Sequence, residues 1–492
     1  MQVLLLVGAA AAAPPLRSME WSHLSNEALR APPVRSGPAP RYFTTLQDHF
    51  NASNKKTWQQ AYFVNDTQFD GTGPIFLCVG GEGPPLSGSV VTSSPHCNVA
   101  VEYLAETKGL MFAVEHRYYG CHNSSACPYS ESDSHPLQWL SSRQALEDLA
   151  TFHAHAVAAY NLTHPGNKWV SFGGSYPGML AGWFRVLYPE LVHASVSSSA
   201  PVHAKLDMTE YFDIASRAYS LPSVGGSDAC EGNIRAGHKN IGQLFNTSVG
   251  RYELASLFDE VKARGAEWLD SRANQAAFAG NGVASFPSQG NDPQCKGFGC
   301  GISRICDVMA GGQKADTPVE RLAELANGQR RAHEESATPA DAPPVSRLHA
   351  TLDYWGWQTC NEFGFYQTCE VGSQCFFTQG YNTLPTDDGF CQENWGITPP
   401  MIQASIDASN KHYGALRPDL AHNATRILYV NGNVDPWSGL SILKSPAPTL
   451  PILIVEGASH HAWTHPSTPA DQPSVIKARA LIREQVAEWL GQ

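Results

Sequence analysis

The sequence predicts an α/β fold in which a mainly parallel sheet is interrupted by a mostly helical insertion. Over the first 200 residues, short apolar runs that end in glycine alternate with helical patterns, which is typical of βαβ units. From about residue 201, strand patterns become rare and helical segments dominate. Strand patterns return near residue 425, so we expect the sheet to resume after an insertion of roughly 220 residues.

The strands expected in the first part are short apolar runs followed by turn-forming residues. They are Gly73–Pro84, Gly109–Gly120, Lys168–Gly173 and Leu191–Ser199. The helices expected among them are Trp139–Ala158 and Met179–Leu187, where apolar residues recur at spacings of three and four. The second part contains the strand patterns RILYVNG and PILIVEG and then an amphipathic helix, Ser474–Leu490.

The insertion contains one segment of distinct composition. Residues 312–345 are rich in Ala, Pro, Glu and Arg, and we expect an exposed linker or a long loop there. The predicted organisation therefore has four parts. They are a signal peptide at 1–15, the first part of the α/β core at 40–200, the helical insertion or lid at 201–420, and the second part of the core at 421–492.

The composition is that of a globular chain. Apolar residues make up 42% and charged residues 16% of the 492 residues, which excludes the disordered class. The net charge is −12, which argues against a non-specific nucleic-acid partner because such a protein needs a basic face. Protonation of all 19 histidines would change −12 to +7, so we expect the net charge to change sign in an acidic compartment.

Three features predict the secretory pathway. The apolar run Val3–Ala13 is too short to span a bilayer and ends in small residues, as signal peptides do, although no basic residue precedes it. The 12 cysteines are an even number and are expected to pair as disulfides, since no CxxC zinc pattern is present. Sequons for N-glycosylation lie at Asn51, Asn65, Asn123, Asn161, Asn246 and Asn423.

A candidate nucleophile lies where an expected strand meets an expected helix. Ser175 stands in SFGGSYPG, close to the G-x-S-x-G nucleophile elbow, whose small residues permit a sharp turn that exposes the serine hydroxyl. The last position of the strict motif is Pro177 rather than glycine, and a plain Gly-Ser loop is the alternative interpretation. A serine needs an adjacent base to act as a nucleophile, so partners are required elsewhere in the chain.

An acid and a histidine follow the serine in the chain order that such an elbow requires. Asp435 follows the strand pattern Ile427–Val430, and His460 follows the strand pattern Ile452–Val455. Both are therefore expected at the carboxyl ends of parallel strands, where catalytic loops gather. His460 would accept the serine proton while Asp435 holds the imidazole, and His461 is the main rival for the base.

Backbone N–H groups are expected to stabilise the oxyanion. One belongs to Tyr176, directly after the nucleophile, and the other to the loop Gly80–Gly83, with Gly81 as the candidate. Glu82 is the charged residue of that loop. We expect it either to bind a substrate amine or to form a local salt bridge.

The motifs SFGGSYPGMLAGWFR, FAVEHRYYG, WLSSRQALEDLATFH, NGNVDPWS and EGASHH together resemble the Pro-X carboxypeptidase and dipeptidyl-peptidase II family of serine peptidases. The segment YWGWQTCNEFGFYQTC (354–369) is most similar to the thymus-specific serine protease branch. The resemblance covers the chain from about Asp48 to Leu490. It implies an α/β-hydrolase core with a helical lid, and cleavage after proline or small residues in a lysosomal, vesicular or secreted setting. The triad that it implies is Ser175, Asp435 and His460.

Two departures from the family pattern bear on the substrate pocket. Pro177 stands where a small residue is usual, and Ala462–His465 stands where an acidic, leucine-containing run is common. Met179 and Trp437 lie close to the triad in sequence and are expected to wall a pocket for a prolyl ring. Ordinary core packing is the alternative for both side chains.

The sequence thus predicts a serine peptidase that works through an acyl-enzyme, without a metal or an organic cofactor. A lipase or esterase on the same fold and a non-catalytic binding protein are the alternatives. A dipeptidyl peptidase would need an acid for the substrate amine (Glu82 or Glu115), and a carboxypeptidase a cation (Arg117 or Arg143). The expected partner is a peptide substrate. We expect no nucleic-acid partner and no membrane partner, and the formation of a homodimer is left open.

Overall fold

In the part of the chain that the structure describes, eight strands form one sheet in the order β1-β2-β4-β3-β5-β6-β9-β10. The pairs β1–β2 and β2–β4 are antiparallel, and every other neighbouring pair is parallel. Two antiparallel pairs at one edge of an otherwise parallel sheet, with this strand order, make the α/β-hydrolase fold. The predicted fold class is confirmed.

The computed structural model describes residues 37–94, 96–121, 124–130, 132–311, 317–336, 352–384, 389–414 and 424–491. The expected signal peptide lies outside these ranges. The strands of the sheet are β1 Arg41–Leu46, β2 Thr57–Asn65, β3 Ile75–Val79, β4 Leu110–Val114, β5 Trp169–Gly174, β6 Ala194–Ser198, β9 Ile427–Gly432 and β10 Ile452–Val455.

The central strands are buried on both faces, against two separate cores. On β4, Leu110, Phe112 and Val114 pack into one core, and Met111 and Ala113 pack into the other. Successive side chains of a strand point to opposite faces, so a strand covered on both sides is apolar at every position. This is why these strands are recognisable as unbroken apolar runs in the sequence.

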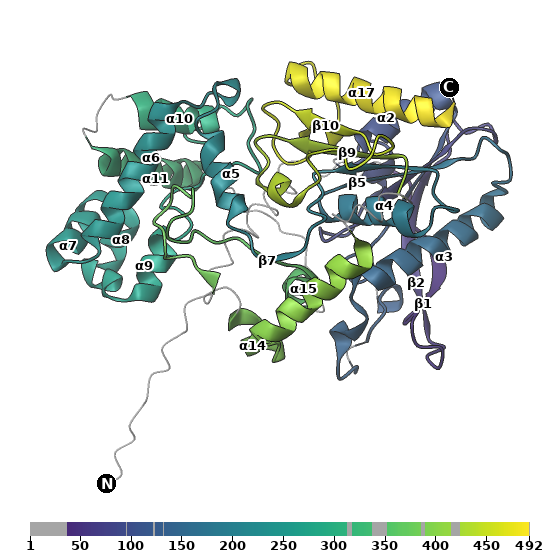
Figure 1. The fold of residues 1–492 in the computed structure, drawn as a ribbon, viewed down its shortest axis with the longest axis horizontal. Helices are drawn as coiled ribbons and strands as arrows, with labels where there is room; N and C mark the ends of the chain where they lie inside the picture. The colour runs from purple at the N-terminus through teal and green to yellow at the C-terminus, as the bar shows by residue number, and fades with distance from the viewer. Residues whose placement is uncertain are drawn as a thin grey trace, which may run out of the picture. The chain divides into compact units, whose positions relative to one another are not determined.

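Helices cover both faces of the sheet (Figure 1). Helices α3 (Ser142–Tyr160) and α4 (Tyr176–Leu187) contribute to the first core, and α2 (Asn98–Thr107) and α17 (Pro473–Leu490) contribute to the second. Helix α3 begins three residues later than the predicted Trp139, because the Ser141 hydroxyl accepts a hydrogen bond from Gln144 N and caps the helix.

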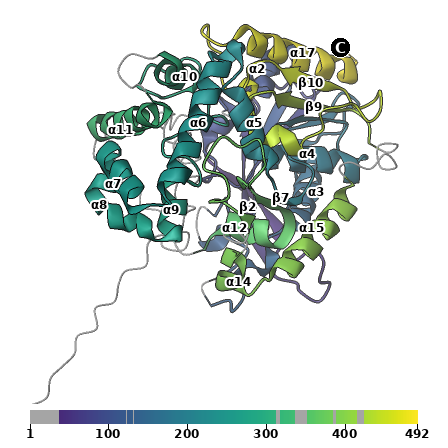
Figure 2. The same ribbon diagram turned by 60° about the vertical axis from the view of Figure 1, so that its left-hand side comes forward.

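The chain between β6 and β9 is mostly helical, and α6 to α11 group together away from the sheet in both views (Figures 1 and 2). Two short strands pair with each other in parallel. Strand β7 (Lys205–Asp207) lies near the start of this segment, and strand β8 (Gly364–Tyr366) lies in its later part. The helices are α5 Glu210–Ala218, α6 Asp228–Leu244, α7 Ser248–Leu257, α8 Asp259–Arg264, α9 Arg272–Ala279, α10 Ile302–Gly311, α11 Pro318–Ser336, α12 Tyr354–Gln358, α14 Gly389–Trp395 and α15 Pro399–Tyr413.

The linker or loop expected at 312–345 is wrong for its central part, which forms α11. Thr317 and Glu320 form a reciprocal capping box: the Glu320 carboxylate accepts from Thr317 N at 2.9 Å, and the Thr317 hydroxyl accepts from Glu320 N at 3.4 Å. Leu322 and Leu325 of this helix are fully buried. The Ala, Glu and Arg content that suggested an exposed segment is also the composition of a good helix.

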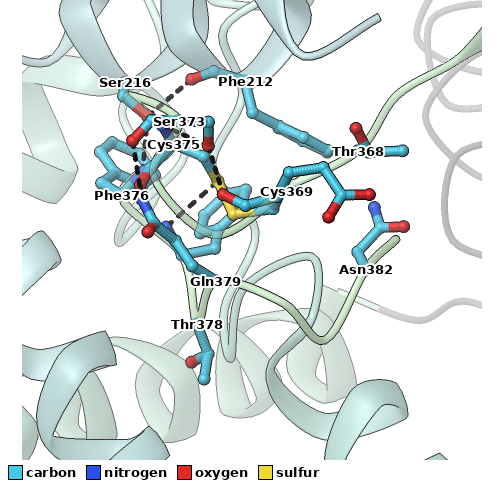
Figure 3. Close-up of a disulfide and its surroundings, with 12 residues drawn as sticks. Phe212, Ser216, Thr368, Cys369, Ser373, Cys375, Phe376, Thr378, Gln379 and Asn382 are labelled. Atoms are coloured by element: carbon cyan, nitrogen blue, oxygen red, sulfur yellow. Dashed lines mark hydrogen bonds between the residues drawn. A yellow bond between two sulfur atoms is a disulfide. The ribbon is translucent and has the colours of Figure 1, made fainter. Parts of the chain in front are cut away.

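All 12 cysteines are paired, which confirms the disulfide prediction. One bond, Cys369–Cys375, closes a loop that contacts α5 through Ser216 (Figure 3). The Ser216 hydroxyl accepts from Phe376 N at 2.9 Å and donates to Phe212 O at 2.6 Å. The other bonds are Cys78–Cys97, Cys121–Cys127, Cys230–Cys306, Cys295–Cys300 and Cys360–Cys391. Among the described residues, no helix is both long enough and apolar enough to cross a bilayer.

Candidate active site

Ser175 stands on a sharp turn between β5 and α4. Its backbone has φ 64° and ψ −132°, a conformation that a non-glycine residue adopts only when its surroundings impose it. The turn is possible because two flanking glycines let backbone segments touch. A Cβ on Gly173 would lie 2.1 Å from Pro177 O, and one on Gly178 would lie 2.7 Å from Ser198 O. This is the geometry of a nucleophile elbow.

Pro177, the departure from the strict motif, contacts the predicted oxyanion loop. A Cβ added to Gly81 would lie 2.2 Å from Pro177 Cγ, so the ring packs directly against the Gly81 backbone. The loop Gly80–Gly83 therefore lies beside the first turn of α4, where Tyr176 is the first helical residue. The first N–H groups of a helix have no acceptor within the helix.

Asp435 and His460 form a buried pair. Asp435 Oδ2 lies 2.9 Å from His460 Nδ1, and the two residues are 0% and 3% exposed. Asp435 also accepts from Trp437 N at 3.0 Å, which fixes the carboxylate at the start of a 3₁₀ turn. His460 N donates to Gln289 O at 3.1 Å, so the insertion helps to hold the histidine loop.

His461, the rival base, has different partners. Its backbone N donates to the Ser199 hydroxyl at 2.8 Å, and its Nδ1 lies 3.2 Å from the Thr464 hydroxyl. Its ring fills the space beside Gly174, where an added Cβ would lie 3.0 Å from the ring. Burial lowers the pKa of His461 well below its ordinary value. The carboxylate of Asp435 is bonded to His460, not to this neighbour.

Glu82 interacts electrostatically with His460 of the buried pair. It is half-buried, and burial raises its pKa to about 7, while the positive charge of His460 opposes that shift. Within the described residues its carboxylate forms no ion pair or side-chain hydrogen bond, so the local salt bridge considered from the sequence is not found. Burial raises the pKa of Tyr119 and of Tyr176 well above the ordinary value, and the nearby Glu82 adds to both shifts.

The two expected pocket walls differ in exposure. Met179 is 0% exposed within the core beneath α4, which favours core packing for this side chain. Trp437 is partly exposed, and its ring centroid lies 6.4 Å from that of His460. Its other ring neighbours come from the insertion: Phe365 at 5.6 Å and Tyr211 at 5.4 Å. These insertion aromatics were not identified from the sequence.

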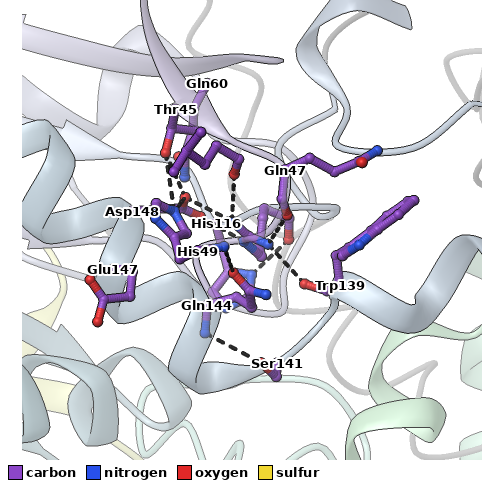
Figure 4. Close-up of polar contacts among 12 residues, drawn as sticks. Thr45, Gln47, His49, Gln60, His116, Trp139, Ser141, Gln144, Glu147 and Asp148 are labelled. Atoms are coloured by element: carbon purple, nitrogen blue, oxygen red, sulfur yellow. Dashed lines mark hydrogen bonds and ion pairs between the residues drawn. The ribbon is translucent and has the colours of Figure 1, made fainter. Parts of the chain in front are cut away.

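The cations considered for a carboxylate clamp have other partners. Arg117 is fully buried and forms a two-point ion pair with Asp148. Its remaining N–H groups donate to the carbonyls of Gln47, Trp139 and Leu46, so all five donors are used. Figure 4 shows this polar cluster around Asp148. Arg143 is exposed and lies over the ring of Phe50, and Glu115 accepts from Leu86 N.

The sequons fall into three groups. Asn51, Asn161 and Asn246 are exposed. Asn65 is half-buried, and its Nδ2, the atom that a glycan would modify, donates to Val91 O at 2.8 Å. Asn123 and Asn423 lie outside the described residues.

A family model described as "Serine carboxypeptidase S28" matches residues 45–482. The chain belongs to this family. The S28 chain is 32% identical over 465 residues to the thymus-specific serine protease of Mus musculus, covering 90% of this chain and 86% of the relative. It is 32% identical over 475 residues to the Homo sapiens protein of the same name, covering 92% and 87%.

The S28 chain is also 25% identical over 510 residues to the lysosomal Pro-X carboxypeptidase of Mus musculus, covering 99% of this chain and 96% of that one. The resemblance recognised in the sequence motifs is thus confirmed. This S28 protein is a serine-type peptidase, as predicted, and its substrates are peptides. Its six disulfides indicate the secretory pathway.

Proposed function

We propose that Ser175, Asp435 and His460 are the catalytic triad of an exopeptidase that releases dipeptides from free amino termini after proline or a small residue. The observation that carries this proposal is the 2.9 Å contact between Asp435 Oδ2 and His460 Nδ1. A carboxylate only accepts, so Nδ1 carries the proton and Nε2 is left as the base. This is the tautomer that a serine peptidase needs.

The reaction follows from these roles. His460 Nε2 takes the Ser175 proton as the hydroxyl oxygen attacks the substrate carbonyl, and the N–H groups of Tyr176 and Gly81 stabilise the oxyanion. His460 then protonates the leaving amine, and the acyl-enzyme remains. Water, deprotonated by the same histidine, attacks the acyl group and restores the serine.

Two features support the choice of substrate. Glu82, whose carboxylate forms no ion pair within the described residues, supplies a negative group for a substrate ammonium, while Arg117 has no donor left for a substrate carboxylate. Trp437, which is partly exposed with its ring 6.4 Å from that of His460, supplies an aromatic surface that suits a prolyl ring. We further propose that residues 201–420 act as the lid over a core formed by 40–200 and 421–492 and that they restrict access to short peptides.

The test uses purified protein and the Ser175→Ala variant with two peptides at about pH 5.5 and 7.5, on either side of the ordinary histidine pKa. One peptide has proline second from a free amino terminus, and the other has proline next to last. We expect loss of the amino-terminal dipeptide with wild type only, and no cleavage when that terminus is acetylated. Loss of the last residue instead would make the protein a carboxypeptidase.

The two rival classes have their own outcomes. Faster turnover of simple esters than of any peptide would favour a lipase or esterase. Absence of labelling by a serine-directed fluorophosphonate would favour a binding protein.

Within the secretory pathway we propose a vesicular, lysosomal or secreted location with glycans at the exposed sequons Asn51, Asn161 and Asn246, which glycosidase-dependent mass shifts would test. The homodimer stays a prediction, which a measurement of the molecular mass in solution by light scattering would test.

A further inference from the structure

A continuous set of hydrogen bonds surrounds the hydroxyl of Tyr176, the residue after the candidate nucleophile. The Tyr176 hydroxyl lies 2.9 Å from His116 Nε2 and 3.1 Å from Gln358 Nε2. His116 follows β4 of the sheet, whereas Gln358 ends α12 of the insertion. Both partners are buried, at 3% and 0% exposure, and Tyr176 is 1% exposed.

The direction of every bond in this set can be assigned. His116 Nδ1 lies 2.7 Å from Arg117 O, so it carries the proton and Nε2 accepts from the Tyr176 hydroxyl. The Tyr176 oxygen then accepts from the Gln358 amide, whose own oxygen accepts from the Tyr119 hydroxyl at 2.6 Å. Burial lowers the pKa of His116 to about 4, which agrees with a neutral ring.

Each end of the set is braced. Gln358 Nε2 also donates to Glu362 at 3.0 Å, and Glu362 accepts from both the N–H and the hydroxyl of Ser142 at the start of α3. At the other end, the chain next to His116 is held by the buried pair of Arg117 and Asp148, part of the cluster in Figure 4. The hydrogen bonds thus join the sheet, α3 and the insertion.

The ring of Tyr176 is also enclosed by aromatic side chains. Its centroid lies 5.4 Å from that of His116, 5.5 Å from that of Trp355 and 5.7 Å from that of Phe363. A side chain held on its faces and at its tip leaves its own backbone little freedom. The peptide that precedes Tyr176 is set by the ψ angle of Ser175, which lies in a strained region that needs such support.

We infer that His116 and Gln358 are positioning residues that hold the Tyr176 hydroxyl and thereby orient the Ser175–Tyr176 peptide, whose N–H faces the oxyanion. The inference rests on the proposed function of Ser175. It gives the insertion a role in the chemical step, because Gln358 comes from the insertion. A donor that is displaced rather than deleted stabilises the oxyanion less well, so turnover falls while substrate binding is retained.

The experiment measures the rate of fluorophosphonate labelling, because the phosphoryl oxygen occupies the same site as the oxyanion and no peptide needs to be known. The variants are Tyr176→Phe, Gln358→Leu and the double variant. Each single change is expected to slow labelling about tenfold, part of the loss seen when an oxyanion donor is deleted. The double variant should be no slower than the slower single variant, because both changes break the same bond.

The end point of labelling separates positioning from loss of folded protein: all variants should reach the wild-type stoichiometry, only more slowly. With the peptide that is cleaved, kcat should fall and KM should stay within about twofold. The matched control is Tyr219→Phe, which removes a fully buried hydroxyl that has no hydrogen-bond partner among the described residues. It should label at the wild-type rate.

The outcomes are distinguishable. If Tyr176→Phe and Gln358→Leu label as fast as wild type while Ser175→Ala is unlabelled, the positioning inference is overturned and the proposed function stands. A reduced end point at an unchanged rate, or additive losses in the double variant, overturns it as well. An unlabelled wild type overturns the proposed function itself.

Discussion

The ring of Pro177 packs against the backbone of Gly81, so the elbow that carries the candidate nucleophile and the loop expected to complete the oxyanion hole are in direct contact. No side chain of any size fits at Gly81 unless the elbow or the loop moves. The residue that departs from the strict elbow motif therefore has a structural role. It spaces two segments that are 96 positions apart along the chain, between Gly81 and Pro177.

Gly81→Ala is accordingly expected to lower kcat about 100-fold, the cost of losing one oxyanion donor. The new methyl group would lie 2.2 Å from Pro177 Cγ and would push the loop away. Steady-state kinetics measures the effect. Gly232→Ala in α6, where an added Cβ meets nothing within 4 Å, is the matched control and should keep wild-type kcat. An unchanged kcat in Gly81→Ala would argue that the oxyanion is held elsewhere.

Asp435→Asn should reduce kcat by about 10⁴ without unfolding the protein, as asparagine substitution does in other serine peptidases. The amide keeps the shape but favours the tautomer in which His460 Nε2 carries the proton and is no base. The comparison is Asp471→Asn, which affects an acid paired with Arg479 and should leave kcat within a few-fold. Equal losses in the two variants would remove Asp435 from the triad.

The affinity for substrates with a free amino terminus should depend on the ionisation of Glu82. Its pKa is about 7, so the carboxyl is neutral below and charged above that pH. KM for such a peptide is expected to fall several-fold as the pH rises from about 5.5 to 7.5, because the substrate ammonium favours the charged carboxylate. Glu82→Gln should abolish this dependence, and an acetylated peptide should not show it. A pH-dependent KM in the variant would assign the effect to another group.

The stability of the fold should decrease on acidification because ten histidines of the described residues have lowered pKa values, in each case mainly through burial. The pKa of His238 is about 3 in the folded chain. The unfolded chain therefore binds more protons below the ordinary value of 6.5, and stability that is complete above pH 6.5 is lost as the pH falls. The ten are His96, His116, His153, His155, His193, His203, His238, His412, His461 and His465.

Urea unfolding at pH 7 and at about pH 4.5 measures this loss. His238→Gln should lose about 3 kcal/mol less than wild type between these pH values, since each pKa unit corresponds to about 1.4 kcal/mol. Identical losses would mean that His238 is hydrated in the folded state.

Much of the fold was predictable because its signals are local. A strand buried on both faces is apolar at each position, so β3, β4, β5 and β9 stand out in the sequence. The carboxyl ends of β9 and β10 also mark the loops that carry Asp435 and His460. Composition alone does not distinguish helix α11 from an exposed segment, and the local signal that marks its start is the Thr317–Glu320 capping box.

The sequence by itself determined the fold class, the peptidase family and the order of the candidate triad, since each depends on residues that are neighbours in the chain or on short motifs. Only the tertiary structure decided which histidine pairs with Asp435, that Pro177 packs on Gly81, and that Gln358 contacts Tyr176 from 182 positions away. The reason is physical: a hydrogen bond or a ring contact between distant segments depends on how the insertion packs on the sheet, and no periodicity within either segment encodes that packing.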